Sequence, residues 1–167
     1  LSYGNHDGYT TIQLAQYMST IANGGYRMRP YIVKQIRGTN KDGSLGAIEY
    51  TTKPEVLGTI PATAAEWKIV KEGLYDVVHG SSTYITGKKL ASDTPSISGK
   101  TGTGETFYKN NSTITLSFAG YAPSNNPQVV VALAIPGAST DGGANLTMAS
   151  QIFKAFWKDV KSSKDYQ

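Results

Sequence analysis

The sequence predicts an α+β fold in which helices pack on an antiparallel β-sheet. Two amphipathic helical stretches stand in the first half of the chain, a third stands near its end, and three β-type runs lie between the second and the third. The 11 Tyr and 18 Gly among 167 residues also favour sheet and turns alongside the helices. This length suits one domain with a sizeable core. We expect the domain to cover residues 1–161 and a polar tail to follow at 162–167.

Both N-terminal helices are predicted from capping boxes, in which Thr is followed three residues later by Gln or Glu. The first helix begins after Thr10, and the second covers 64–78 after Thr63. Glycines end both of them, at 24–25 and at Gly80. Their apolar side chains recur at helical spacing, which predicts core packing. These are Leu14, Tyr17, Met18 and Ile21 in the first helix, and Trp67, Val70, Leu74, Val77 and Val78 in the second.

The strands are predicted from β-type runs. Residues 31–37 form a short run, and residues 47–50 form a small strand inside a loop-rich segment. Residues 96–105 form the next strand, and residues 114–121 alternate apolar and polar side chains. Residues 129–135 are continuously apolar, which predicts a central strand covered on both faces. The last two strands make a hairpin, and the 96–105 strand is expected to pair with its first arm.

The last helix is predicted over 145–161, after the flexible loop 136–143. Its apolar face combines Ala149, Ile152, Phe153, Phe156 and Val160. The tail beyond it is polar, and we expect it to fray.

Composition excludes several classes of protein. The net charge of +4 is mild, and no basic run is interleaved with aromatic residues, so we expect no nucleic-acid partner. The absence of Cys excludes disulfides, thiol catalysis and Cys-based metal sites. No stretch approaches the about 18 apolar residues of a membrane span, and no signal peptide is visible. Because the chain begins at Leu1, we expect a fragment or a processed product.

The most informative stretch is the strand at 96–105, which contains Lys100-Thr101-Gly102. A strand edge with one cation and the hydroxyls of Thr101 and Thr103 can hold a carboxylate, and glycines let another backbone approach closely. The Lys-Thr-Gly triad is one of three motifs shared by penicillin-binding proteins and class A β-lactamases. By itself the triad also fits an exposed strand that runs into a Gly-rich turn.

Other candidate sites fail on spacing or context. Gly99-Lys100-Thr101 is not a phosphate loop, because Thr94 stands where a second Gly is needed and no helix follows. The later glycines lack the helix of a dinucleotide site, and no residues have metal-ligand spacing. His79 follows Asp76 by one turn, but a His at a helix end is more often structural. We expect no catalytic role for His79 or His6.

The whole sequence resembles the C-terminal part of the transpeptidase domain of class B penicillin-binding proteins, of the 2B type of Gram-positive bacteria. The resemblance covers nearly the full chain and includes the order of the elements. It is carried by residues 9–17, by Ile21-Ala22-Asn23-Gly24-Gly25, by Pro30-Tyr31-Ile32-Val33, by Ser98-Gly99-Lys100-Thr101-Gly102-Thr103, and by Tyr121-Ala122-Pro123 with Asn126-Pro127.

The chain departs from the family pattern at its first two motifs. The family's nucleophile lies in Ser-x-x-Lys, and no Ser here has Lys three positions later. The literal Ser-x-Asn match, Ser124-Asn125-Asn126, follows Lys-Thr-Gly and is interpreted as a turn. Tyr3-Gly4-Asn5 is interpreted as the Gly-containing segment before the first helix. We therefore expect the nucleophile on an N-terminal part of the same protein, and we expect this chain alone to be inactive.

The resemblance implies a serine D,D-transpeptidase that cross-links peptidoglycan stem peptides and is acylated by β-lactam antibiotics. It implies that the backbone N–H of Thr103 is one oxyanion donor and that the Thr101 and Thr103 hydroxyls hold the substrate carboxylate. Lys100 would assist proton transfer, and Gly102 would let the substrate backbone approach the strand. Glu105 is interpreted as a rim residue rather than a general base. No cofactor and no metal are implied.

Two alternatives remain open at this point. One is a hydrolase of the same fold, a β-lactamase or D,D-carboxypeptidase, and the other is a non-catalytic module that senses β-lactams or binds the cell wall. The resemblance places the protein on the extracytoplasmic face of the bacterial plasma membrane, with the anchor outside this chain.

Overall fold

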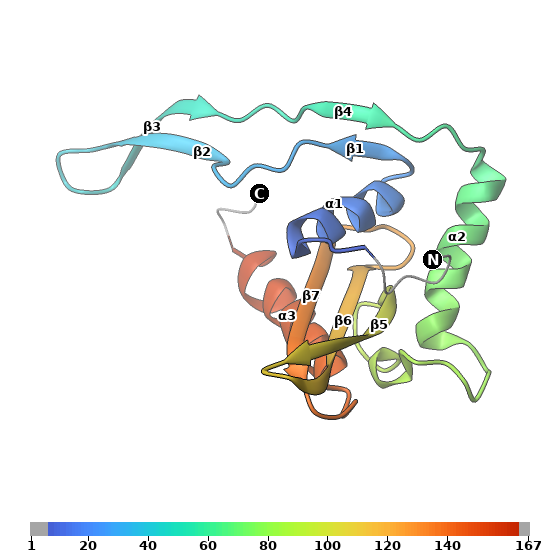
Figure 1. Cartoon of the computed structure of the whole chain (residues 1–167). Coiled ribbons are helices and arrows are strands. Elements are labelled where there is room, and N and C mark those ends of the chain that lie inside the picture. Colours follow the sequence, from blue (N-terminus) through green and yellow to red (C-terminus); the bar gives the residue numbers. More distant parts are fainter. Residues whose placement is uncertain (1–6, 164–167) are drawn as a thin grey trace.

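A computed structural model describes residues 7–163 of the chain (Figure 1). The expectations for Tyr3-Gly4-Asn5, His6 and residues 164–167 lie outside the described residues. In chain order the elements are α1 (Thr11–Ala22), β1 (Tyr26–Met28), β2 (Gln35–Thr39), β3 (Leu45–Thr51), β4 (Val56–Thr59), α2 (Ala64–His79), the 3-10 turn η1 (Lys88–Leu90), β5 (Ser98–Tyr108), β6 (Asn111–Ala122), β7 (Val129–Ala138), α3 (Ala144–Ala155) and the π-helical turn η2 (Phe156–Val160).

The main sheet has three antiparallel strands in the order β5-β6-β7. Both predicted pairings are confirmed, since Lys100 faces Ala119 across β5 and β6, and Phe118 faces Leu133 across β6 and β7. The prediction that residues 129–135 form a central strand is wrong: in the described chain β6 is central and β7 lies at an edge. The apolar run of β7 reflects cover on its two faces, since both α1 and α3 contact it.

Each face of the sheet carries its own hydrophobic cluster. On the α3 side, Phe118 and Phe153 are almost fully buried, and the start of β5 and the end of α2 complete the cluster. On the α1 side, Met18 and Ala22 pack against Tyr121. Burying one large apolar side chain contributes about 1.5–3 kcal/mol. These two clusters fix the sheet between α1 and α3. In the described chain no further strand pairs with the outer edge of β5, although α2 contacts that strand.

Residues 26–59 form an arm of two separate two-stranded sheets, β1–β4 and β2–β3 (Figure 1). The small strand predicted at 47–50 is confirmed within β3, but the run predicted at 31–37 is displaced, because the strand begins at Gln35 and ends at Thr39. β1 and β4 were not predicted at all. They are short, largely exposed strands, so they lack the alternation that marks a half-buried strand.

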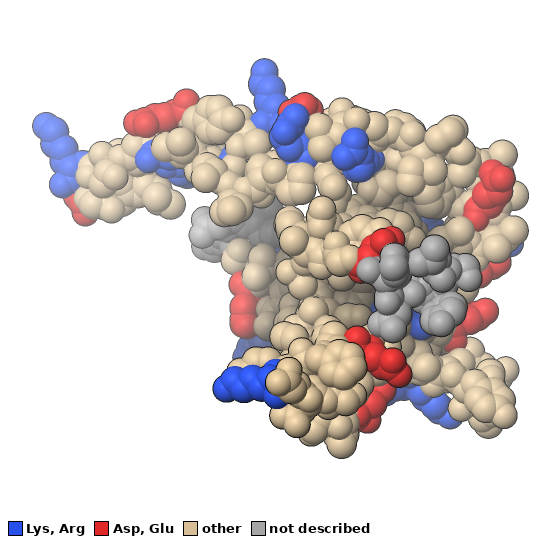
Figure 2. Space-filling model, in the orientation of Figure 1, with Lys and Arg blue, Asp and Glu red and all other residues tan. Residues whose placement is uncertain are grey.

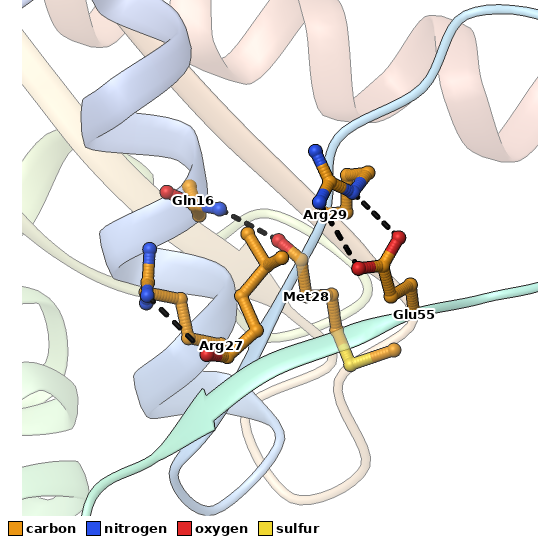
Figure 3. Close-up of polar contacts among 6 residues, drawn as sticks. Gln16, Arg27, Met28, Arg29 and Glu55 are labelled. Carbon is orange, nitrogen blue, oxygen red and sulfur yellow. Dashed lines mark hydrogen bonds and ion pairs between the residues drawn. The ribbon is translucent and has the colours of Figure 1, made fainter.

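Polar contacts tie the arm to α1 and to itself, as Figure 3 shows. The side-chain amide of Gln16 donates to the carbonyl of Met28 over 2.6 Å. The guanidinium of Arg29 makes two hydrogen bonds to Glu55, at 2.6 and 3.0 Å, and these bonds lower the pKa of the Glu55 carboxyl. Lys and Arg side chains stand along the outside of the arm (Figure 2).

Both capping boxes are confirmed. Thr10 with Gln13 and Thr63 with Glu66 exchange the two expected hydrogen bonds. The apolar faces are only partly covered, however. Met18 and Ile21 are buried, whereas Tyr17, predicted on the same stripe, is 60% exposed, and Val70 on α2 is 42% exposed. Helical spacing predicts which side chains share a face, but it does not predict how far the neighbouring elements cover that face.

Candidate active site

The Lys-Thr-Gly triad lies in β5, the strand whose outer edge is open in the described chain. Successive side chains of a strand point to opposite faces. Lys100 and Gly102 therefore face the α1 side of the sheet, and Thr101 and Thr103 face the α3 side. The structure thus brings the two threonine hydroxyls to one face, as a carboxylate ligand would require, and places the ammonium of Lys100 on the other.

Gly102 has an internal reason to be glycine. A Cβ built on Gly102 would overlap Oγ of Ser117, its register partner on β6. Gly99 is more tightly constrained, because its Cβ would lie 2.6 Å from the ring of Phe118 and 2.7 Å from the carbonyl oxygen of Ala119. The sequence predicts that another backbone can approach Gly102 closely. On the α1 face, Ser117 of β6 already occupies the space beside it.

Thr101 is held by a residue that the sequence did not single out. Its hydroxyl lies 2.6 Å from the hydroxyl of Thr86, which belongs to the segment between α2 and η1. This hydrogen bond fixes the Thr101 side chain on the α3 side of the sheet. Thr86 belongs to a polar stretch without periodicity, so no sequence signal distinguishes it from its neighbours.

Thr103 is engaged by a second unpredicted residue. Its hydroxyl donates to the carboxylate of Asp141 over 3.2 Å. Asp141 lies between β7 and α3, in the loop that the sequence predicted as flexible. The C-terminal end of that loop is fixed by Asn145, which is buried and donates to the carbonyl of Ser117 over 2.8 Å.

Lys100 is exposed, and its ammonium donates to the carbonyl of Thr101 over 3.0 Å. Within residues 7–163, no carboxylate forms an ion pair with it. Its charge is therefore available to groups that approach the α1 side of the strand edge.

A groove of about 500 Å³ runs beside this part of β5. It is lined by Asp7, Gly102, Thr103, Gly104, Glu105, Thr115 and Ser117. Backbone and hydroxyl groups make most of this lining, and its charged members are acidic. Because Gly102 pairs with Ser117 and Gly104 with Thr115, the groove lies over the α1 face of β5 and β6.

The other candidates of the sequence have structural roles. His79 contacts the carbonyl of Ile97 through its Nε2 at 3.0 Å and stacks on Tyr75 with ring centres 4.3 Å apart. It therefore joins the end of α2 to the start of β5, as the structural interpretation predicts, and it contacts Ile97 rather than Asp76.

Ser124, in the literal Ser-x-Asn match, also has a structural contact. It lies in the turn between β6 and β7, where its hydroxyl accepts a hydrogen bond from Ser98 over 2.8 Å. The adjacent hydroxyl of Tyr121 is buried, and burial raises its pKa. The hydrogen bond between Ser98 and Ser124 joins the start of β5 to the turn, whereas the buried Tyr121 hydroxyl has no hydrogen-bond partner among the described residues.

The described residues contain neither a cluster of metal ligands nor a helix that could span a membrane. From Asp7 to Ser163, no three His, Cys, Asp or Glu side chains gather as a metal site would require. Over the same range, no helix has the length and apolar character of a membrane span.

The fold and the strand motif define the class of protein. This chain belongs to the penicillin-binding protein transpeptidase domain family, whose model matches residues 1–158. It is 37% identical over 160 residues to penicillin-binding protein 2B of Streptococcus pneumoniae, and this match covers 94% of the chain and 24% of the relative. The α+β fold and the 2B-type resemblance predicted from the sequence are thereby confirmed.

A solved structure and a more distant relative agree with this assignment. The structure of penicillin-binding protein 2B from Streptococcus pneumoniae strain R6 superimposes with a TM-score of 0.88 at 34% identity, covering 97% of this chain and 27% of that one. The peptidoglycan D,D-transpeptidase MrdA of Haemophilus influenzae is 29% identical over 161 residues, covering 87% of this chain and 23% of the relative. The chain thus spans about a quarter of the length of these relatives.

Proposed function

We propose that the complete protein is a serine D,D-transpeptidase that cross-links peptidoglycan stem peptides and is acylated by β-lactams. One observation carries the proposal: the Thr101 and Thr103 hydroxyls share one face of an open strand edge, and Lys100 occupies the other. The family's name and the name of the Haemophilus relative support transpeptidation over hydrolysis or sensing.

In this proposal β5 binds the substrate and stabilises the oxyanion that develops during the reaction. The nucleophile lies in another part of the protein. The acyl carbonyl of the substrate lies against the strand, where the backbone N–H of Thr103 donates to the developing oxyanion. Losing one such donor costs about 2.7–4 kcal/mol of activation free energy. The hydroxyls of Thr101 and Thr103 hold the terminal carboxylate of the stem peptide, or the carboxylate of a β-lactam that imitates it.

Lys100 acts on the opposite side of the strand. Its ammonium raises the local positive potential and donates to the serine of the family's Ser-x-Asn motif, which aids transfer of the proton from the nucleophile to the leaving amine. Because Lys100 is exposed in this chain and carries no ion pair with the carboxylates of residues 7–163, it remains free for such a partner.

The proposed partner on that side is the N-terminal part of the same protein, which carries the nucleophile. The accessible surface of the chain supports a partner on that side. It is 11467 Å², whereas a compact protein of this mass is expected to have about 8,000 Å². The projecting arm accounts for part of the excess. Apolar side chains on the helices add to it, including Ile69 at 69% exposed, and a hollow of about 770 Å³ beside α2 is lined by Trp67 and Tyr75.

The proposed site of action is the extracytoplasmic face of the bacterial plasma membrane, since stem peptides are cross-linked outside the cell. The anchor belongs to the part of the protein outside this chain.

Labelled penicillin tests the function directly. The complete protein, incubated with a fluorescent penicillin, should form a covalent adduct that survives denaturing electrophoresis. A stable adduct supports a transpeptidase, whereas rapid release of hydrolysed antibiotic would support a β-lactamase. Absence of both would refute the proposal.

A further inference from the structure

The hydroxyl of Thr103 already has a carboxylate partner within the chain. It donates its single proton to Oδ2 of Asp141 over 3.2 Å. A threonine hydroxyl has one donor proton. While this bond lasts, Thr103 cannot donate to the carboxylate of a ligand.

The charges around Thr103 also oppose an anionic ligand. Asp141 brings a negative charge to the α3 side of β5, and Glu105 lies two residues from Thr103 on the same face of the strand. Lys100, the cation of the triad, faces the other way. A ligand carboxylate at Thr103 therefore stands beside the negative charge of Asp141. The cation at the α3 end of the same loop, Lys89, is bonded to Thr147.

Asp141 lies in the segment between β7 and α3, with a glycine on each side of it. Gly137 and Gly143 flank it with φ angles of +72° and +68°, which glycine adopts without strain. Beyond the loop, Asn145 is buried and holds α3 to β6 through the carbonyl of Ser117. Asp141 itself is exposed and contacts Thr103 through its carboxylate, so one exposed hydrogen bond must break before the Thr103 hydroxyl can donate to a ligand.

We infer that Asp141 is a specificity-determining residue of the proposed transpeptidase site, because its carboxylate occupies the Thr103 hydroxyl and competes with the carboxylate of the ligand. This inference rests on the proposed function. It has a specific consequence: Asp141 weakens the non-covalent binding of ligands with a free carboxylate, and it has no such effect on ligands that lack one. The chemical step after binding is unchanged, since Asp141 has left the hydroxyl by then.

The test uses the complete protein and two ligands, benzylpenicillin and its methyl ester, each competing with a fluorescent penicillin. The concentration dependence of acylation separates non-covalent affinity from the acylation rate constant. For Asp141→Ala we expect non-covalent affinity for benzylpenicillin to rise roughly three- to tenfold, the range of an exposed hydrogen bond to a charged group. Asp141→Asn should gain less, because its amide oxygen can still accept the Thr103 proton. The acylation rate constant and the affinity for the ester should stay unchanged.

Two further variants separate the hydrogen bond from general effects of charge. Asp159→Asn removes an exposed carboxylate from η2 and should change neither ligand's binding. Glu105→Gln removes a charge near Thr103 without removing the Asp141 contact, and should give a smaller gain than Asp141→Ala.

Three results would overturn the inference: unchanged affinity for benzylpenicillin in Asp141→Ala, an equal gain for the acid and the ester, or a gain in Glu105→Gln as large as in Asp141→Ala. An equal gain for acid and ester would mean that residue 141 acts through the mobility of its loop. An equally large gain in Glu105→Gln would mean that negative charge in general, rather than the hydrogen bond, weakens binding. A wild-type protein that takes up no label would instead refute the proposed function itself.

Discussion

Oγ of Ser117 occupies the space that a side chain on Gly102 would need, so a Cβ at this position of the Lys-Thr-Gly triad requires Ser117 to change its rotamer. Gly102→Ala should therefore destabilise the complete protein by roughly 1–2 kcal/mol, since one methyl group is forced against a neighbour that can partly rotate away. Denaturant unfolding measures this change.

The double variant Gly102→Ala with Ser117→Ala separates the internal role of Gly102 from its proposed external one. Removing Oγ of Ser117 should restore the free energy of unfolding. If Gly102 also admits the substrate backbone, the restored protein should still be acylated slowly by labelled penicillin. Normal acylation of a restored protein would leave Gly102 with the internal role alone.

Lys100→Ala should reduce the rate of acylation of the complete protein by roughly 10²–10³, because a group that assists proton transfer is lost. Its stability should change by less than about 0.5 kcal/mol, since Lys100 is exposed. Stopped-flow labelling with a fluorescent penicillin gives the rate, and Lys41→Ala, in the turn of the β2–β3 hairpin, is the matched control. An unchanged rate would show that the site has been misplaced.

Thr86→Val should weaken the non-covalent binding of benzylpenicillin roughly three- to tenfold, the range of one neutral hydrogen bond. The reason is that Thr86 can donate to the Thr101 hydroxyl, which leaves the single proton of Thr101 for the carboxylate of the proposed ligand. The concentration dependence of acylation measures the change, with Thr83→Val in the same segment as control. If Thr86→Val binds like the wild type, Thr101 needs no such support.

Asn145→Ala should lower the stability of the complete protein by about 1–3 kcal/mol, because it removes a buried side chain that hydrogen-bonds Ser117 and leaves polar groups unpaired. Thermal unfolding measures the loss, and Asn126→Ala in the exposed β6–β7 turn should be close to neutral. A melting temperature equal to the wild type's would mean that water replaces the amide.

Local signals predicted the parts of the fold that local interactions determine. The capping boxes at Thr10 and Thr63 bond within four residues, and their helices begin where the sequence indicates. The alternation of β6 likewise reflects two unequal faces, since Leu116 and Phe118 are buried and Thr115 and Ser117 are only half-buried. The strands of the arm were misplaced or missed, because they are exposed and their partners stand far along the chain, as Tyr26 pairs with Thr59.

The candidate site divides in the same way. The triad is visible in the sequence because its residues are contiguous on one strand. Thr86 and Asp141 were not predicted, since each is an ordinary polar residue of a loop and reaches β5 only through the tertiary fold. The place of β7 at the edge of the sheet was missed for a related reason: an apolar run reports cover on both faces, not the number of neighbouring strands.

We propose that this chain supplies the Lys-Thr-Gly strand, β5, of an acyltransferase whose nucleophile lies outside residues 1–167. Labelling with fluorescent penicillin, followed by mass spectrometry of the labelled peptide, tests it most directly. The account predicts an adduct on a serine outside this chain in the complete protein, and no labelled band for the 167-residue chain alone. An adduct on any residue of this chain would contradict it.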